Sequence, residues 1–463
     1  MVILAAGLGS RMRSSIPKVL HRVAGRTMIE AVVETAQSVA PSAIVAVLGA
    51  GREQVAAVLE GHAVSVVVQD PPRGTGDAVR AALSSLDNGN GPVIVLSGDA
   101  PLLTTATLNS LLNLQRKQSL DLAFLSFRPP DPADFGRVVR DRSGRVKRVV
   151  EYRNASDREK QVGEVNAGVY CFAGPALAPA IQKLRPNKVN GEYYLTDTIE
   201  TLASKAGKVD AVEASDWREA WGINTRRDLA AAEEIERRRI LERALDGGAT
   251  IQDPTTTRIG PHVRLEPDVV IHPFVSLEGK TALGEGCEVL PYTRISDTTI
   301  AARSVIGPHC DVEGARIGQR VRVGPFARLR PETVLEDDVR VGNFVETKKA
   351  RLGKGTKALH LSYLGDADIG EGANIGAGTI TCNYDGEKKH GTVIGDGSFI
   401  GSDSQLVAPV KVGKGAYVGA GTTVTHDVPD GALAVSRTPQ KNIDGWADKR
   451  AARKQKTRAQ AKE

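Results

Sequence analysis

Two patterns of hydrophobic and polar positions divide the chain. Over roughly the first 225 residues, short apolar runs alternate with longer segments in which apolar residues recur at helical spacing. The apolar runs cover residues 2–4, 44–48, 64–68 and 93–96, and the helical segments cover residues 28–38, 53–59 and 77–86. Buried strands of a parallel sheet read as short apolar runs, and their crossovers read as helices. This half therefore predicts a Rossmann-like α/β domain with a mostly parallel sheet, whose ligands gather beyond the carboxyl ends of the strands.

The second pattern is a six-residue step. From about residue 249, an aliphatic residue followed by glycine recurs mostly at spacings of 6, 12 and 18 residues, at 317–318, 323–324, 341–342, 369–370, 375–376, 394–395, 400–401, 412–413 and 418–419. Neither an amphipathic helix nor a hairpin meander has this period. It is typical of a parallel β-helix, in which three hexapeptides complete one coil. The 19-residue interval from Ile375 to Ile394 contains Asn383 to His390 and predicts an inserted loop, which on such folds often builds a binding site.

Glycine content and the joining segment fit this division. Of the 48 glycines, 26 lie between residues 251 and 437, and 21 lie in the first 250 residues. Residues 226–245 are charged and rich in Ala and Leu, and Gly247-Gly248 follows them, a pattern that predicts a helix and its end. We therefore expect an α/β domain over residues 1–225, a helical linker over 226–248, and a β-helix with a basic tail over 249–463.

Charge and cysteine content narrow the classes of function. The net charge is +6, but residues 447–463 carry seven Lys or Arg against two Asp or Glu, so the rest of the chain is nearly neutral. A basic tail without aromatic residues is more typical of a solvated terminus than of a nucleic-acid arm, and we expect no nucleic-acid partner. The four cysteines lack C-x-x-C spacing, so neither a zinc site nor a disulfide framework is indicated. No apolar run approaches the roughly 18 residues of a membrane span, and residues 1–7 lack the basic start of a signal peptide, so we expect a cytoplasmic protein.

The turn after the first apolar run has the features of a phosphate site. Gly7 and Gly9 let backbone N–H groups approach phosphate oxygens, and Arg11 and Lys18 add cationic donors. The turn is neither a dinucleotide fingerprint nor a Walker P-loop, and alone it is weak evidence. Asp99 follows the apolar run at 93–96, at the carboxyl end of another predicted strand. A lone Asp there is usually a turn or cap residue, but its place at the same edge favours a ligand for Mg²⁺.

Longer motifs resemble one enzyme family. In the first half, residues 7–12 (GLGSRM) with Pro17-Lys18, Gln69, residues 74–76 (GTG) and Gly98-Asp99 resemble the sugar-1-phosphate nucleotidyltransferases. In the second half the motifs are residues 324–331 (GPFARLRP), 343–346 (NFVE) with Lys348-Lys349, 360–366 (HLSYLGD) and 376–386 (GAGTITCNYDG). Together they resemble the bifunctional N-acetylglucosamine-1-phosphate uridyltransferase/glucosamine-1-phosphate N-acetyltransferases, over residues 2 to about 439. Ser10 stands where the family usually has Thr, which keeps the hydroxyl group.

The resemblance implies two consecutive reactions. The β-helix, left-handed in that family, would transfer an acetyl group from acetyl-CoA to glucosamine-1-phosphate. The α/β domain would then transfer a uridylyl group from UTP to N-acetylglucosamine-1-phosphate and release pyrophosphate. The product, UDP-N-acetylglucosamine, is a precursor of peptidoglycan and lipopolysaccharide.

For uridylyl transfer, the resemblance implies a set of binding residues. Gln69 and Thr75 would lie near the uracil, Arg11 and Lys18 would face the triphosphate, and Asp99 and Asn224 would hold Mg²⁺. The remaining contacts would come, for the nucleotide, from Leu4, Ala5, Ala6, Gly7 and Gly74 and, for the sugar, from Gly136, Glu151 and Asn166. From the residues alone, Glu151 and Asn166 could equally be exposed strand residues, and Asn224 could be a helix N-cap.

For acetyl transfer, the amine must lose a proton before it can attack a thioester, so a base is needed. His360 is the candidate because imidazole titrates near physiological pH, although a single His on a β-helix is more often an exposed corner residue. Arg330 and Lys348 are 18 residues apart, which is one coil, and we expect them to stack as a phosphate site. The resemblance adds further sugar or acetyl-CoA contacts at Tyr363, Asn374, Ala377, Asn383, Tyr384, Ser402, Ala420 and Arg437.

The assembly and two other function classes complete the expectations. A triangular prism has flat faces that can pack around an axis, and the resemblance implies a homotrimer. A uridyltransferase whose β-helix served only assembly would need no base and no phosphate site in its second half, so His360 with Lys348 argues against it. A pure binding scaffold would leave Asp99 and the Gly7 to Lys18 turn unexplained.

Overall fold

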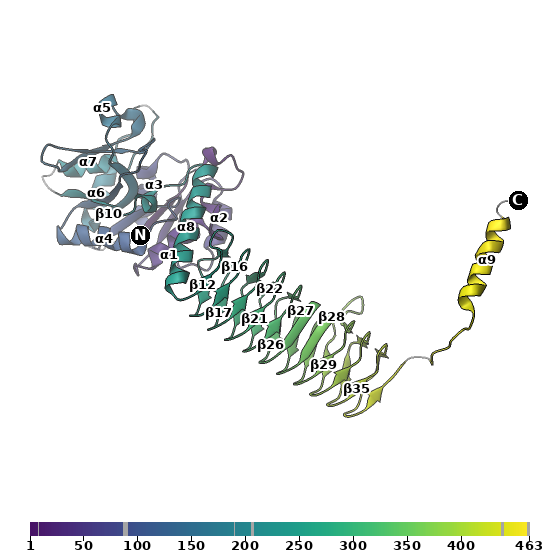
Figure 1. The fold of residues 1–463 in the computed structure, drawn as a ribbon. Helices are drawn as coiled ribbons and strands as arrows, with labels where there is room; N and C mark the ends of the chain where they lie inside the picture. Colours follow the sequence, from purple (N-terminus) through teal and green to yellow (C-terminus); the bar gives the residue numbers. More distant parts are fainter. Residues whose placement is uncertain (8, 87–90, 189, 205–207, 437–438, 461–463) are drawn as a thin grey trace. The chain divides into compact units, whose positions relative to one another are not determined.

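The computed structural model describes residues 1–463 except 8, 87–90, 189, 205–207, 437–438 and 461–463. The chain forms two compact units, Met1–Glu242 and Arg243–Glu463 (Figure 1). The first is an α/β domain and the second is a left-handed parallel β-helix of hexapeptide repeats. The dividing point lies inside helix α8 (Arg226–Asp246), and not at either end of it.

A nine-stranded sheet forms the centre of the first unit. Seven strands follow the order β11-β7-β10-β6-β1-β4-β5, and β8 and β9 lie off this path. Their bounds are β1 Val2–Ala5, β4 Val45–Leu48, β5 Ser65–Val68, β6 Val93–Ser97, β7 Leu122–Phe127, β8 Arg137–Arg140, β9 Val146–Val150, β10 Val165–Phe172 and β11 Val209–Glu213. The pairs β1–β4, β1–β6, β4–β5 and β7–β11 are parallel, whereas β10 runs antiparallel between β6 and β7. The sheet is thus mostly parallel, and the four expected apolar runs form β1, β4, β5 and β6.

Helices and two small strands surround this sheet. The helices are α1 Met28–Gln37, α2 Arg52–Leu59, α3 Thr75–Ala82, α4 Thr105–Lys117, α5 Asp157–Lys160, α6 Gly174–Gln182 and α7 Asp197–Ala203, and the small strands are β2 Arg22–Val23 and β3 Arg26–Thr27. Two clusters of buried side chains, one containing Ile3 and Ile94 and the other Val2 and Val95, reflect the period-2 alternation of the strands. Helix α1 begins with a capping box, in which Thr27 and Glu30 satisfy each other's backbone N–H groups. The segment expected as a helix over 77–86 begins earlier, at Thr75, and its last turn is a 3-10 turn over Leu83–Ser85.

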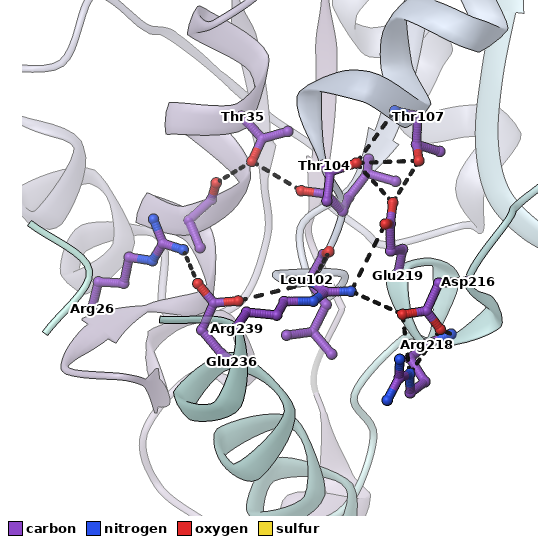
Figure 2. A network of polar contacts seen from close by, with 12 residues as sticks. Arg26, Thr35, Leu102, Thr104, Thr107, Asp216, Arg218, Glu219, Glu236 and Arg239 are labelled. Atoms are coloured by element: carbon purple, nitrogen blue, oxygen red, sulfur yellow. Dashed lines mark hydrogen bonds and ion pairs between the residues drawn. The ribbon is translucent and has the colours of Figure 1, made fainter. Parts of the chain in front are cut away.

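Helix α8 packs on the first unit instead of standing free of it. Its residue Ala232 belongs to a buried cluster with Val23, Met28 and Leu102. Figure 2 shows the polar network around this helix, in which Glu236 pairs with Arg26 (3.0 Å). Arg239 donates to the carbonyl oxygen of Leu102 (2.8 Å) in the same network. The charged pattern that predicted a linker therefore includes side chains that fix most of the helix to the α/β domain.

The second unit is built of short parallel strands that pair one coil apart. Ile271 pairs with Val289, for example, and both side chains are buried in the core of the coil. The strands are β12 Thr250–Ile251, β13 Arg258–Ile259, β14 Arg264–Leu265, β15 Val270–Ile271, β16 Ser276–Glu278, β17 Ala282–Leu283, β18 Glu288–Val289, β19 Arg294–Ser296, β20 Thr299–Ile300, β21 Val305–Ile306, β22 Asp311–Glu313, β23 Arg316–Ile317, β24 Arg322–Val323, β25 Arg328–Leu329, β26 Val334–Leu335, β27 Arg340–Leu352, β28 Lys357–Ile369, β29 Asn374–Ile375, β30 Ile380–Cys382, β31 Thr392–Ile394, β32 Phe399–Ile400, β33 Gln405–Val407, β34 Val410–Val412, β35 Tyr417–Val418, β36 Thr423–Val424 and β37 Leu433–Ala434.

Two features interrupt the regular coils. Strands β27 and β28 each run for 13 residues and pair over most of their length. The expected inserted loop leaves the helix between β30 and β31, and an antiparallel bridge between Tyr384 and Lys389 closes it. The basic tail contains helix α9 (Trp446–Gln460), whose described side chains are exposed. In the described part of the chain, no helix is long and apolar enough to cross a membrane.

Candidate active sites

Four of the predicted residues of the first unit meet at one edge of its sheet. The amide oxygen Oδ1 of Asn224 accepts hydrogen bonds from Arg11 Nη2 (2.9 Å) and from Lys18 Nζ (3.2 Å). Lys18 Nζ also forms an ion pair with Asp99 Oδ2. Residues from three distant parts of the sequence therefore converge within hydrogen-bond distance of one ammonium group.

The sheet explains this convergence. Strands β1 and β6 are parallel neighbours, with Leu4 opposite Ser97, so their carboxyl ends lie side by side. The backbone N–H of Gly98 donates to the carbonyl oxygen of Leu4 (2.9 Å), which ties the two ends together. Ser97 Oγ donates to Asp99 Oδ1 (2.6 Å) and orients the carboxylate. The backbone N–H of Ile223 donates to the carbonyl oxygen of Asp99 (2.9 Å) and brings the neighbouring Asn224 to the same edge.

Asn224 does not cap helix α8, which answers one alternative from the sequence. Thr225 and Asp228 fill that role, because Thr225 Oγ1 accepts from the backbone N–H of Asp228 (3.1 Å) and Asp228 Oδ2 accepts from that of Thr225 (2.8 Å). The Asn224 side chain is left to face the cationic groups of the turn. Its oxygen and Asp99 Oδ2 both accept from Lys18 Nζ, so two oxygen atoms face one cationic group.

Asp99 Oδ2 and Asn224 Oδ1 suit a Mg²⁺ ion that also binds the phosphates of the substrate. Mg²⁺ is usually held by one or two protein carboxylates together with substrate phosphates, not by a complete cage of protein ligands. Among the described residues, no group of three or more His, Cys, Asp or Glu side chains could hold a metal ion. A site made of one carboxylate and one amide oxygen fits the few protein ligands that Mg²⁺ usually has, and it does not need a larger cluster of ligands.

The residues predicted near the uracil lie beyond the edge strand β5, which β4 separates from β1; Gln69 directly follows β5, and Thr75 begins α3. Gln69 is buried, and its Nε2 donates to the carbonyl oxygen of Gly74 (3.1 Å) and to Asp77 Oδ2 (3.0 Å). Gly74 has φ +100, and a Cβ there would lie 2.7 Å from the carbonyl oxygen of Tyr193, so only glycine fits. Thr75 Oγ1 accepts from the backbone N–H of Leu195 (3.0 Å). The same edge holds a cavity of about 500 Å³ lined by Gln69 and residues 49–54.

Of the remaining nucleotide residues, Ala5 and Ala6 are buried and Leu4 is half-buried at the end of β1. The next residue, Gly7, is exposed and begins the phosphate turn. All four therefore lie at the edge of the sheet where Asp99 and Lys18 meet. Backbone atoms, and not large side chains, border the site on this side.

The three predicted sugar residues also lie together. The backbone N–H of Asn166 donates to the carbonyl oxygen of Gly136 (2.9 Å), and a Cβ on Gly136 would lie 3.6 Å from Glu151 Oε2. Asn166 Nδ2 donates to the hydroxyl of Tyr170 (2.7 Å), and Thr196 Oγ1 donates to Glu151 Oε1 (3.0 Å). Burial raises the pKa of the Glu151 carboxyl, against the effect of the Thr196 hydrogen bond. Glu151 is half-buried and Asn166 is buried, so neither is the exposed strand residue of the alternative.

In the β-helix, His360 faces an amide from the preceding coil. His360 lies in β28 directly opposite Asn343 in β27, and its Nδ1 is 3.0 Å from Asn343 Oδ1. The imidazole is exposed. It is therefore accessible to a substrate and also held by a defined partner.

His360 and three small residues form a column along one corner of the coils. We define the corner column as His360, Ala377, Ser402 and Ala420, one from each successive coil. Backbone hydrogen bonds link these coils, from Gly378 N to Leu361 O (2.9 Å), from Asp403 N to Ala377 O (2.7 Å) and from Gly421 N to Ser402 O (2.8 Å). The predicted base and three predicted acetyl-CoA residues thus share one corner of the prism.

A cluster of cations lies further along the same pair of strands. Lys348 is opposite Gly365 in the register of β27 and β28, and Arg330 lies one coil earlier, with its Nη1 3.0 Å from Glu346 Oε1. Lys389, from the inserted loop, lowers the pKa of Lys348 most strongly, and Arg330 lowers it further, because like charges disfavour the ammonium form. The sequence did not identify Lys389, because the path of a loop cannot be read from the hexapeptide period.

The side chains of Tyr363 and Asn383 both pack against Gly365. A Cβ on Gly365 would lie 2.5 Å from the Tyr363 hydroxyl oxygen and 2.8 Å from Asn383 Nδ2. The two side chains are themselves in contact, at 3.5 Å, and Asn383 Nδ2 also donates to Asp366 Oδ2. Asp366 raises the pKa of Lys348, so this cluster and the cations adjoin. Asp366 and Asn343 are further residues that sequence reasoning missed.

Two predicted residues, Asn374 and Tyr384, lie apart from these contacts. Asn374 lies in β29, between Lys357 and Phe399 in the register of the coils. Tyr384 is exposed in the inserted loop, where its hydroxyl donates to the carbonyl oxygen of Gly386 (2.5 Å). Arg437 lies outside the described residues.

Comparisons with known proteins agree with both halves. The family described as MobA-like NTP transferase domain matches residues 1–202, the GMPPB C-terminal domain matches 247–369, and the bacterial transferase hexapeptide (six repeats) matches 391–426. Three relatives carry the name bifunctional protein GlmU. That of Thermodesulfovibrio yellowstonii is 44% identical over 97% of this chain and 99% of its own length. Those of Sorangium cellulosum and Pelobacter propionicus are each 46% identical, over 98% and 96% of this chain and 96% and 97% of their own lengths.

Proposed function

The chain belongs to the family of the bifunctional protein GlmU, and on this basis we propose a role for each of its two sites. The enzyme makes UDP-N-acetylglucosamine in two steps, acetyl transfer to glucosamine-1-phosphate and uridylyl transfer to N-acetylglucosamine-1-phosphate. The α/β unit carries the uridylyl transfer and the β-helix carries the acetyl transfer. Each reaction therefore has its own folding unit and its own set of side chains.

In uridylyl transfer the nucleophile is a phosphate oxygen of N-acetylglucosamine-1-phosphate, which attacks the α-phosphorus of UTP, and pyrophosphate leaves. No strong base is needed, so positioning and charge neutralisation supply the catalysis. Arg11 and Lys18 neutralise the triphosphate from the turn that follows β1. Gln69 and Thr75, with Gly74 and the backbone of residues 4–7, hold the nucleoside. Gly136, Glu151 and Asn166, which lie together, hold the sugar.

Asp99 and Asn224 would hold Mg²⁺ together with the substrate phosphates. When bound there, the ion neutralises charge on the phosphates. The support for this role is that Asp99 Oδ2 and Asn224 Oδ1 already face one cationic group, Lys18 Nζ. Arg11 holds the Asn224 oxygen from a second side (2.9 Å), which leaves the amide little freedom to rotate away.

In acetyl transfer, His360 is the general base. Its Nε2 takes a proton from the amino group of glucosamine-1-phosphate, and the nitrogen then attacks the thioester carbonyl of acetyl-CoA. The new C–N bond forms, the C–S bond breaks, and the CoA thiolate leaves and is protonated. The cations Arg330, Lys348 and Lys389 bind the sugar phosphate, since converging positive charges favour a phosphate between them.

The other predicted residues complete this site. Tyr363 and Asn383 hold the sugar beside the phosphate, with Asn374 on the next strand. Tyr384 presents its exposed ring from the inserted loop. The small residues of the corner column, with Arg437, leave a track for the pantetheine chain of acetyl-CoA that ends at His360.

The assembly that we propose is a homotrimer formed through the β-helix. Its support is an exposed ladder of stacked rings from Phe274, Tyr292, His309, Phe326 and Phe344, with centroids 4.8 to 5.4 Å apart. The phenylalanine and tyrosine rings of this ladder are 47–56% exposed, and contiguous apolar surface of this kind marks association sites. We also propose a cytoplasmic location, where UTP and acetyl-CoA are available, and no nucleic-acid partner.

The observation that supports these assignments is that each unit has its own cluster of cations, Arg11 and Lys18 beside Asp99 in the first and Arg330, Lys348 and Lys389 near Asp366 and Asn383 in the second. The test supplies each substrate set separately to the purified chain. Acetyl-CoA with glucosamine-1-phosphate should release free thiol without UTP. UTP with N-acetylglucosamine-1-phosphate should release pyrophosphate without acetyl-CoA, and only when Mg²⁺ is present. A chain that released pyrophosphate but no thiol would contradict the β-helix assignments.

A further inference from the structure

The contact between His360 and Asn343 selects one form of the imidazole ring. The Asn343 side-chain oxygen faces Nδ1 at 3.0 Å. An amide oxygen accepts hydrogen bonds, so with this oxygen facing the ring, Nδ1 carries the proton and the lone pair of the neutral ring is on Nε2. In the described part of the chain, the hydrogen-bond partner of this ring is an amide and not a carboxylate.

The sequence of this corner changes at the point where the contact forms. The residue one coil before His360 is Asn343, and the equivalent residues of the four earlier coils are prolines. The stacked rings that follow each of them fix this equivalence, since Phe274, Tyr292, His309, Phe326 and Phe344 come directly after Pro273, Pro291, Pro308, Pro325 and Asn343. A proline side chain accepts no hydrogen bond. Of these five positions, only that of Asn343 is not proline, and it places a hydrogen-bond acceptor next to His360, one coil before it.

The two strands hold the pair rigidly. Asn343 and His360 are direct partners in the parallel register of β27 and β28, and the pairs Val345–Ser362 and Glu346–Tyr363 follow them. Phe344, next to Asn343, stacks on Phe326 with ring centroids 5.4 Å apart. Both side chains therefore start from a paired backbone and need few rotatable bonds to meet, so the ordering costs little entropy.

We propose that Asn343 is the positioning residue of the acetyl-transfer base, which holds His360 as the Nδ1–H tautomer with Nε2 directed at the amine. This rests on the proposed role of His360. The hydrogen bond persists when Nε2 takes up the proton, and it strengthens because the donor ring is then charged. Asn343 thus acts both on the orientation of the base and on the stability of its protonated form, without touching the substrate.

The test compares Asn343→Ala, Asn343→Asp and His360→Ala by the pH dependence of acetyl transfer. Asn343→Ala should lower kcat about 10-fold, the value of one hydrogen bond, with the KM for glucosamine-1-phosphate within twofold of wild type. Asn343→Asp keeps the acceptor and adds a negative charge. It should retain most of the kcat above neutral pH and move the acidic limb of the pH–rate profile upward by about one unit, because a carboxylate favours the imidazolium. The shift shows that position 343 contacts the base, and the kcat that Asn343→Asp retains but Asn343→Ala loses separates a positioning acceptor from an asparagine that only supports the fold.

Glu288→Ala is the matched control, because it removes the acceptor of another β-helix histidine, His272, whose Nε2 is 2.7 Å from Glu288 Oε1. It should leave acetyl transfer unchanged. An Asn343→Ala rate within twofold of wild type, or an unshifted acidic limb in Asn343→Asp, would overturn the inference while leaving His360 as the base. A near-normal rate in His360→Ala would instead refute the proposed function itself. Uridylyl transfer, measured in every variant, reports whether the chain has folded.

Discussion

The glycine at position 365 offers a sensitive test of the acetyl-transfer site. An added Cβ would lie 2.5 Å from the Tyr363 hydroxyl oxygen and 2.8 Å from Asn383 Nδ2. Carbon atoms need about 3.5 Å to pack without repulsion, so Gly365→Ala must displace both polar groups by about 1 Å. Because these are the ends of side chains, they can yield while the strand stays in place.

We expect this substitution to damage binding more than stability. A displacement of about 1 Å at a positioning group costs up to about 100-fold in rate, so kcat/KM for glucosamine-1-phosphate should fall by about 10-fold to 100-fold. The free energy of unfolding should fall by about 1 kcal/mol, the low end for overpacking, because the clash is relieved at side-chain ends. The assay is thiol release from acetyl-CoA at varied glucosamine-1-phosphate, together with thermal unfolding.

Gly391→Ala provides the control, since its Cβ would meet only the carbonyl oxygen of Asp366, at an ordinary 3.6 Å. This variant should keep both its kinetics and its melting temperature. If Gly365→Ala retained a KM for glucosamine-1-phosphate and a kcat within twofold of wild type, Tyr363 and Asn383 would not contact the sugar as we propose. A loss of uridylyl transfer in the same variant would show that the whole chain was affected.

The other predictions concern each site and the helix that joins the units. His360→Ala should lower acetyl transfer by about 10² to 10⁴-fold and leave uridylyl transfer from supplied N-acetylglucosamine-1-phosphate unchanged; a loss of only a few-fold would exclude it as the base. Asp99→Ala should abolish most Mg²⁺-dependent pyrophosphate release while thiol release persists, and normal release at ordinary Mg²⁺ would contradict the metal assignment. Glu236→Ala should destabilise the α/β unit by about 1 kcal/mol in chemical denaturation, because Arg26 and Arg239 lose their shared carboxylate but keep Glu34 and Asp216 as partners; an unchanged midpoint would show that Glu236 adds nothing to the network in Figure 2. Light scattering of the wild-type chain at micromolar concentration should give a trimer mass, and a monomer mass would refute the proposed assembly.

Much of the fold can be predicted from the spacing of apolar residues, because the burial of these residues fixes that spacing. The aliphatic residue of each hexapeptide must point into the coil, so positions such as Ile369 and Ile400 were legible without any structure, and both are fully buried. The first unit was harder. Its strand β10 is apolar like β6 and β7 on either side of it, so nothing in the sequence marks it as antiparallel to them. Helix α8 reads as solvent-exposed, since the burial of Glu236 becomes visible only when Arg26 is known to lie beside it.

Some residues of the candidate sites could likewise be predicted from the sequence, and others could not. Residues that follow predicted strands, such as Asp99 and Gln69, could be assigned to one edge because parallel strands end together. Lys389 could not be assigned, because it reaches Lys348 by way of an aperiodic loop. Asn343 was in principle legible, but only after the coil lengths of 17 and 18 residues are counted correctly and the run of prolines before it is recognised. The sequence therefore shows best those contacts whose geometry the regular elements dictate.

The inserted loop adds side chains that we propose as substrate contacts without disturbing the corner column. Before it, Tyr363 pairs with Ile380, and after it Ala367 pairs with Thr392, so the parallel register continues on both sides of the loop. Ala377 and Ser402 are 25 residues apart instead of 17 or 18, yet Asp403 N still donates to Ala377 O (2.7 Å), as expected for consecutive coils. The extra residues are confined to the loop, where they supply Asn383 and Lys389. On the proposed assignment, the corner column binds the long thioester and the inserted loop binds the small sugar phosphate, so the two substrates contact different parts of the β-helix.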